Sequence, residues 1–493
     1  MASPCRSSGS KTVHPGKKDD RPSYKLPVNH RTSQSAELIV PDAAVPLSNT
    51  RITGSHFGVS DVVMTVRSVI DASVPMRAAS RIIGLTNELN GDEPYDHPSH
   101  TTVQNFILRI GLYLLLRATR PHHDWIWVAD HTYSVGTTKV FVVLGITLTD
   151  FQQLRRPLVH HDLEVLTLLP VDQSNGTIVH QQLTDLVGRV GVPLAVLSDR
   201  GSDLNKGVRL LQQDQPTVIS LYDIVHLTSR KIEKVLNNAP QWDEFRKACC
   251  QCANAVRQST LAHLKPPRPK TKARYMNIDR EVRWGARALR LLDRVREGNL
   301  KVRQQVRLPK GLIEEKFGWL DEYRSSLQQW EHLSLTARHV ISEVRRHGYG
   351  SNTVLALETI VESTPDESSQ RLVRQIIDDV QPMCDLSGRH GSLPASSEVL
   401  ESLFGKGKRL LSGTSSGTTN SLTRQMLAMV TSTARITPTL VQNALASCSV
   451  KNLLKWCSAN FKPSLHVTRR QDLPPTETEQ ILRKPTAHAI PDF

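Results

Sequence analysis

Five short apolar runs lie in the middle of this chain, and they constrain its fold more than any other feature. The runs favour strands, and segments with the 3.6-residue spacing of helices separate the later ones. Neighbouring strands followed by alternating strands and helices predict an α/β fold, a mixed sheet flanked by helices. The predicted strands are 125–130, 139–146, 163–169, 193–199 and 217–221, and the predicted helices are 177–190, 203–212 and 223–236.

Two of these runs end in an aspartate, a residue that is disfavoured in strands and rarely buried without a partner. Asp130 ends the first run, and Asp199 ends the fourth, followed by Gly201, which frees the backbone. An Asp at the end of a strand, taken alone, is more often a turn or cap residue. If the two strands are neighbours in one sheet, however, their carboxylates repel each other unless a cation lies between them. Oxygen ligands favour Mg²⁺ or Mn²⁺.

A third carboxylate is expected on an amphipathic helix predicted from Ser396 to Leu411. Glu398 and Glu401 are three residues apart, so they lie near one face of this helix and both are candidates. Three carboxylates can hold two metal ions about 4 Å apart, an arrangement suited to in-line displacement at a phosphate. One ion would activate water or a 3′-hydroxyl, and the other would stabilise the leaving oxygen.

The order and context of these acids resemble the DDE transposases of bacterial insertion sequences, mobile elements whose enzymes have a ribonuclease-H-like catalytic domain. The resemblance covers roughly residues 60 to 440. Three segments carry it: Trp-Val-Ala-Asp130-His-Thr with the apolar strand after it, Val-Leu-Ser-Asp199-Arg-Gly-Ser-Asp203, and Ser-Ser-Glu-Val-Leu-Glu401-Ser-Leu-Phe-Gly-Lys. Enzymes of this kind interleave a five-stranded sheet with helices, often with a helical insertion before the last acid.

This resemblance implies a DNA transposase, a polynucleotidyl transferase and endonuclease. Such an enzyme cuts DNA at transposon ends and transfers the strands to target DNA by in-line attack on phosphodiesters. The implied catalytic residues are Asp130, Asp199 and Glu401, which would also ligate Mg²⁺ or Mn²⁺, with two ions expected.

Another match follows the fifth predicted strand. Asp223-x2-His226 is similar to the Asp/Cys-x2-His element of transposases with helical insertions. The resemblance implies that His226 contacts the scissile phosphate or orients a ligand, although a structural histidine fits equally well. Asp203, four residues after Asp199, is predicted to cap the helix that follows.

The spacing of Glu401 and Lys408 is similar to the Glu-x6-Lys motif of another insertion-sequence group, and it favours Glu401 over Glu398. That group has a Tyr and an Arg upstream of the glutamate. The chain departs from it, because Pro394 and Ser397 occupy those positions here. Three cations after the acid are expected to bind DNA phosphates. They are Lys406, Lys408 and Arg409.

The segments around the sheet are predicted to be helical or disordered. Near the N-terminus, Ser60 and Asp61 could cap one helix, Pro75 starts a second and Ser99 caps a third. Arg109 is expected on the outer face of the third helix. The arrangement is similar to a helix-turn-helix. The predicted domains are a disordered basic arm (1–48), a helical DNA-binding domain (49–120), the first part of the catalytic core (121–237), an all-helical insertion (238–395), the final acidic helix and those after it (396–445), and a partly disordered C-terminal segment (446–493).

Composition agrees with a DNA partner. Lysine and arginine total 62 against 47 acidic residues, a net charge of +15, which favours polyanions. Seven scattered cysteines form no disulfide framework, and no apolar run reaches the ~20 residues of a membrane span. We therefore expect a cytoplasmic, nucleoid-associated bacterial protein that binds transposon ends and target DNA as a homo-oligomer, without a membrane partner.

Three other interpretations fit the same residues. A structure-specific ribonuclease-H-like nuclease would hydrolyse DNA without rejoining it, but the long helical insertion argues against a minimal nuclease. A catalytically decayed DNA-binding protein derived from a transposase would keep the fold, although the three acids give no sign of decay. A multidomain regulator with coincidental acids is the third.

Overall fold

The structure is a computed structural model that describes residues 51–52, 56–89, 97–133, 139–154, 156–171, 173–239, 241–268, 278–300, 308–410 and 421–460. These residues belong to one compact unit. The predicted basic arm and the segment after residue 460 lie outside the described residues. No helix in the described part of the chain is long and apolar enough to cross a membrane.

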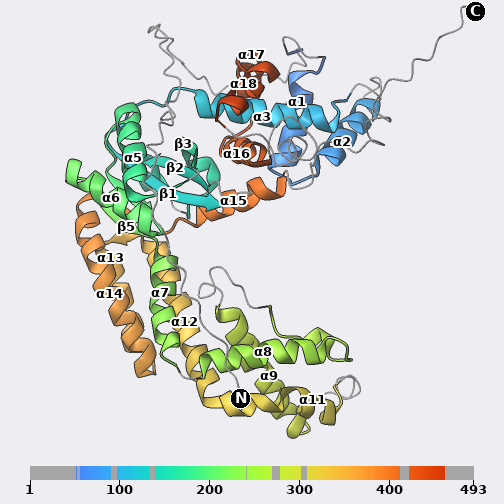
Figure 1. Ribbon diagram of the computed structural model, residues 1–493, viewed down its shortest axis with the longest axis vertical. Helices are drawn as coiled ribbons and strands as arrows, with labels where there is room; N and C mark the ends of the chain where they lie inside the picture. The colour runs from blue at the N-terminus through green and yellow to red at the C-terminus, as the bar shows by residue number, and fades with distance from the viewer. Residues whose placement is uncertain are drawn as a thin grey trace, which may run out of the picture. The chain divides into compact units, whose positions relative to one another are not determined.

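A five-stranded mixed sheet has the strand order β3-β2-β1-β4-β5 (Figure 1). Strands β1 and β2 pair antiparallel, as do β2 and β3, whereas β4 runs parallel to both β1 and β5. The predicted α/β class is therefore confirmed, and all five predicted strands are present. Their bounds are β1 Trp125–Tyr133, β2 Lys139–Thr147, β3 Glu164–Val171, β4 Ala195–Ser198 and β5 Ile219–Tyr222.

The two faces of the sheet pack in different hydrophobic clusters because side chains alternate along a strand. Trp125 and Trp127 of β1 pack in a cluster with apolar residues of α5 and α6. Ile126 and Val128 belong to the larger cluster, which also contains apolar side chains of α3, α7 and α15. The bounds of these helices are α3 His100–Leu116, α5 Gly176–Val190, α6 Ser202–Asp214, α7 Ile224–Asn237 and α15 Glu398–Leu410.

The segment between α7 and α15 is helical, as predicted, apart from a short two-stranded pair. Two of its helices, α12 and α14, pack against α7, and α14 also contacts β5. The pair, β6 Tyr349–Gly350 with β7 Ser392–Leu393, corrects the expectation that this region has no strands. The helices are α8 Trp242–Val256, α9 Ile278–Arg296, α11 Lys310–Phe317, α12 Arg324–His347, α13 Ser351–Ser363 and α14 Glu367–Ser387.

The first helices pack against the last ones. Ser99 caps α3 by accepting a hydrogen bond from Thr102 N, as predicted, whereas the N-cap of α1 is Gly58 rather than Ser60 or Asp61. Arg109 was expected on the solvent-facing side of α3. It instead donates from Nε to Cys448 O and from Nη2 to Leu445 O, both at 2.5 Å. The remaining bounds are α1 Val59–Ile70, α2 Met76–Leu89, α4 Leu148–Gln153, α16 Ser421–Thr431, α17 Pro438–Ser447 and α18 Val450–Asn460.

These contacts bury more than one face of α3, whereas an amphipathic surface helix buries only one. Leu108 and Leu112 are fully buried, and Thr431 Oγ1 of α16 donates to Ile107 O at 2.7 Å. Helices α1, α2 and α3 therefore share a hydrophobic core with the C-terminal helices. The cysteines of the described residues are free thiols, in agreement with the absence of a disulfide framework.

The close approach of α3 to α16 gives a prediction about stability. A methyl group at Gly111 would collide with Leu427 O and lie 2.9 Å from Thr431 Oγ1, whereas one at Gly188 of α5 would meet nothing within 4 Å. We expect Gly111→Ala to lower the free energy of unfolding by about 1–3 kcal/mol through overpacking. The control Gly188→Ala should raise it by about 0.5–1 kcal/mol through helix propensity. Urea unfolding measures both, and equal shifts would contradict the packing argument.

Candidate functional site

The pairing of β1 with β4 brings two aspartates together. In the parallel register Ala129 lies opposite Ser198, so the next residue of each strand is an aspartate, Asp130 and Asp199. Asp199 follows the last residue of β4, as predicted. The prediction that Asp130 ends its strand is wrong, because β1 continues to Tyr133 in antiparallel pairing with β2. Asp130 instead lies where the parallel neighbour ends.

The environment of Asp130 disfavours its charged form. Burial and then the charge of Asp199 raise the pKa of this carboxyl to about 7, with a smaller contribution from Glu401. Two groups act in the opposite direction: His131 N donates to Asp130 Oδ1 at 2.6 Å, and the charge of His226 also lowers the pKa. The side chains of Asp130, Asp199, His226 and Glu401 are thus close enough to influence one proton.

His226 and Glu401 contact each other across two helices. His226 is in the first turn of α7, and its Nε2 lies 3.3 Å from Glu401 Oε1 on α15. Burial lowers the pKa of His226, but the hydrogen bond to Glu401 and the charges of Asp223 and Asp199 raise it above the ordinary value on balance. The predicted third acid therefore lies beside the histidine of the Asp-x2-His element.

Asp223 connects the starts of these two helices. Its Oδ1 caps α7 by accepting hydrogen bonds from Val225 N at 2.8 Å and His226 N at 2.9 Å. Its Oδ2 accepts from Ser397 N at 2.5 Å and Ser397 Oγ at 3.0 Å, immediately before α15. Only 1% of Asp223 is exposed, and four donors satisfy its carboxylate. The residue therefore has a positioning role between the helices that carry His226 and Glu401.

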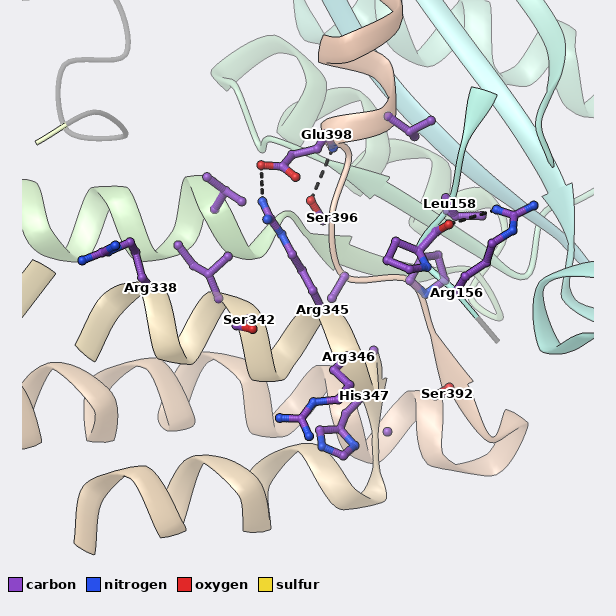
Figure 2. Close-up of a pocket in the computed structure, with 18 of the residues that line it drawn as sticks. Arg156, Leu158, Arg338, Ser342, Arg345, Arg346, His347, Ser392, Ser396 and Glu398 are labelled. Carbon is purple, nitrogen blue, oxygen red and sulfur yellow. Dashed lines mark hydrogen bonds and ion pairs between the residues drawn. The ribbon is translucent and has the colours of Figure 1, made fainter. Parts of the chain in front are cut away.

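Glu398 points away from this group. It forms an ion pair with Arg345 of α12, and its backbone N–H donates to Ser396 Oγ at 3.3 Å (Figure 2). Both residues line a cleft of about 1270 Å³ that α12 and the start of α15 share with Arg156 and Pro157. Because Glu398 is paired on that side and Glu401 contacts His226, the geometry favours Glu401 as the acid closest to Asp130.

The three cations predicted after Glu401 differ in their surroundings. Lys406 is half-buried, and burial lowers its pKa, opposed by the charge of Asp71 at the end of α1. It thus lies against the N-terminal helices. Arg409 is exposed, whereas the side chain of Lys408 lies outside the described residues.

Other residues beside the acids have different roles or were missed in the sequence. Asp203 does not cap α6, whose N-cap is Gly201, and its Oδ2 lies 3.7 Å from Lys139 Nζ. Sequence analysis missed two arginines, Arg200 and Arg230, that lie over the ring of Tyr222. One signal was available: Arg230 follows His226 by four residues, the spacing of one helix face.

The side chains around Asp130 are of the kinds that bind divalent metal ions. Within the described ranges, no three His, Cys, Asp or Glu side chains are placed to form a ready metal-binding group. The chemistry of the donors nevertheless fits a hard cation, since carboxylate oxygens are its usual ligands. The raised pKa of Asp130 reflects a buried negative charge that a cation would compensate.

The double role of Asp223 gives a prediction. In Asp223→Asn, an amide N–H₂ group must face the donors of Ser397 or of α7, so we expect a loss of about 2–3 kcal/mol of stability. The matched control is Asp366→Asn, because Asp366 caps only α14 and asparagine caps equally well. Urea unfolding gives the stability, and hydrogen exchange should show the first turns of α7 and α15 losing protection together. A loss no larger than that of the control would show that the bridge contributes little.

No known protein family matches the chain by sequence, and no curated protein matches it. Among solved structures, the chain has a weak similarity to the Drosophila P element transposase strand transfer complex. The identity is 10%, the overlap covers 76% of this chain and 92% of that chain, and the TM-score is 0.33. Similarity at this level does not establish a shared fold.

Proposed function

We propose that the protein is a DNA transposase with a ribonuclease-H-like catalytic domain, acting as a polynucleotidyl transferase on transposon ends and target DNA. One observation supports this most: the parallel pairing of β1 with β4 sets Asp130 beside Asp199, and α7 and α15 place His226 Nε2 3.3 Å from Glu401 Oε1 in the surroundings of these acids. Acids on neighbouring strands with a third on a late helix are what the DDE resemblance implies. The five-stranded sheet and the helices between α7 and α15 agree with it.

The proposed ligands of the metal ions are Asp130, Asp199 and Glu401. Divalent ions bound there would supply Lewis acidity for in-line displacement at a phosphodiester. The chain's own residues have distinct tasks. Asp130 and Asp199 present oxygens from a rigid sheet, and the bond from His226 holds Glu401 at the edge of this group. His226, beside Glu401, would be placed to donate to a phosphate oxygen of the substrate.

The substrate is expected to be DNA because the proposed reaction needs a polyanion beside the acids. The net charge of +15 favours such a partner. We further propose Mg²⁺ or Mn²⁺ as the cofactor, a homo-oligomer as the active form, and a cytoplasmic place of action.

The experiment that tests this function measures cleavage and strand transfer with Mg²⁺ or Mn²⁺ on DNA that carries the flanking ends of the coding region. We expect Asp130→Ala, Asp199→Ala and Glu401→Ala each to lower the rate by at least about 10²–10³-fold, the size of effect seen when one electrostatic group is removed from an active site. Glu398→Ala is the matched control from the same helix turn and should retain most of the activity, because Glu398 pairs with Arg345.

Each other result has a definite meaning. Cleavage without joined products favours a nuclease over a transposase. Loss of activity in Glu398→Ala but not in Glu401→Ala would overturn the choice of third acid. A parent protein that binds DNA but neither cuts nor joins it would contradict the catalytic proposal and favour a decayed DNA-binding protein.

A further inference from the structure

Two arginines share one aromatic ring next to the acids. Tyr222 is the last residue of β5, and the guanidinium carbon of Arg200 lies 5.0 Å from its ring centroid. The guanidinium carbon of Arg230 lies 5.7 Å from the same centroid. Arg200 directly follows Asp199, and Arg230 is one helical turn after His226 on α7. The two arginines thus lie next to the proposed catalytic group, one directly after Asp199 and the other on the helix that carries His226.

Backbone and ring contacts hold both side chains in place. Arg230 Nη2 donates to Arg200 O at 3.4 Å, and Arg200 Nη2 donates to Ser220 O at 3.3 Å. Arg200 has φ of +51°, one of two non-glycine residues with positive φ in the described part of the chain. This uncommon conformation accompanies a guanidinium that lies over Tyr222. Arg230 itself is exposed, so its side chain is both oriented and accessible.

The charges of this pair are not balanced by carboxylates. Neither arginine forms a salt bridge with any residue that the structure describes, and Asp379, the acid that influences Arg200, is paired with Lys231 at 2.7 Å. Among the residues that the structure describes, the buried Nε of Arg200 has no hydrogen-bond partner. Two guanidinium groups beside one ring repel each other, and an anion bound to the exposed one would offset that repulsion.

We propose that Arg230, held over Tyr222 and against the Arg200 carbonyl, binds a backbone phosphate of DNA beside the phosphate that reacts. The proposal rests on the proposed function, because it places a substrate contact next to the acids. Arginine suits this task, since its planar guanidinium gives two parallel N–H donors to a phosphate and also packs on an aromatic face. Arg200 is mostly enclosed and acts as the support for Arg230.

The test measures DNA affinity without chemistry. The full-length chain binds a fluorescently labelled DNA duplex in EDTA, and anisotropy titrations at several salt concentrations give the slope of log affinity against log salt. Each phosphate contact contributes about 0.9 to this slope. We expect Arg230→Gln to lower its magnitude by about 1. Arg230→Lys should keep the slope but bind more weakly, because lysine keeps the charge without the planar pair of donors.

The matched control is Arg209→Gln. Arg209 is an exposed arginine of α6, and the apolar side chains of α6 pack on the other face of the sheet. The slope of Arg209→Gln should therefore equal that of the parent. The proposal is overturned if Arg230→Gln also has the parent's slope, or if both glutamine variants lower the slope equally. Thermal unfolding of each variant checks that the fold is retained.

This result is separate from the outcome for catalysis. If Arg230→Gln lowers the slope while the parent neither cuts nor joins DNA, the phosphate contact stands and the transposase proposal fails. If the parent joins DNA ends and Arg230→Gln keeps the full slope, the transposase proposal stands and the phosphate contact fails.

Discussion

Strands β1 and β4 run parallel, and their register sets the aspartates that follow Ala129 and Ser198 side by side. Two carboxylates at this position repel each other, and burial of Asp130 increases the cost, since charged groups lose solvation there. A fold selected for stability alone has no reason to keep such a pair. A divalent cation, as proposed above, would offset this repulsion.

Helices α7 and α15 complete the group through a shared anchor. Asp223 satisfies donors at the start of both helices, so the first turn of α7 and the first turn of α15 cannot move independently without leaving buried groups unpaired. A backbone hydrogen bond from Ile224 N to Ala395 O at 2.9 Å also joins the starts of the two helices. His226 and Glu401 are therefore oriented by a contact between residues far apart in the chain, and their mutual hydrogen bond follows from it.

Much of this was predictable from the sequence, because apolar runs and helical periodicity are local. The five strands, the capping role of Ser99 and the helical segment before α15 all followed from such patterns. The end of β1 did not, since its extension beyond Asp130 depends on antiparallel pairing with β2. The outward position expected for Arg109 was also wrong, because helices more than three hundred residues later in the chain cover α3. The spacing of Glu401 and Lys408 already favoured Glu401 over Glu398, and the ion pair of Glu398 with Arg345 agrees with that choice.

That choice also explains what the segment between α7 and α15 contributes. Glu398 and Glu401 are three residues apart, so their directions differ by about 60° around the helix, enough for them to meet different neighbours. Arg345 of α12 forms an ion pair with Glu398, whereas Glu401, about 60° further around the helix, contacts His226. Helix α14 contacts the residue that directly follows Asp199, since Arg200 Nη2 lies 3.9 Å from Met383 Sδ. The helices between α7 and α15 thus contact Glu398 and Arg200, which are near neighbours in sequence of Glu401 and Asp199.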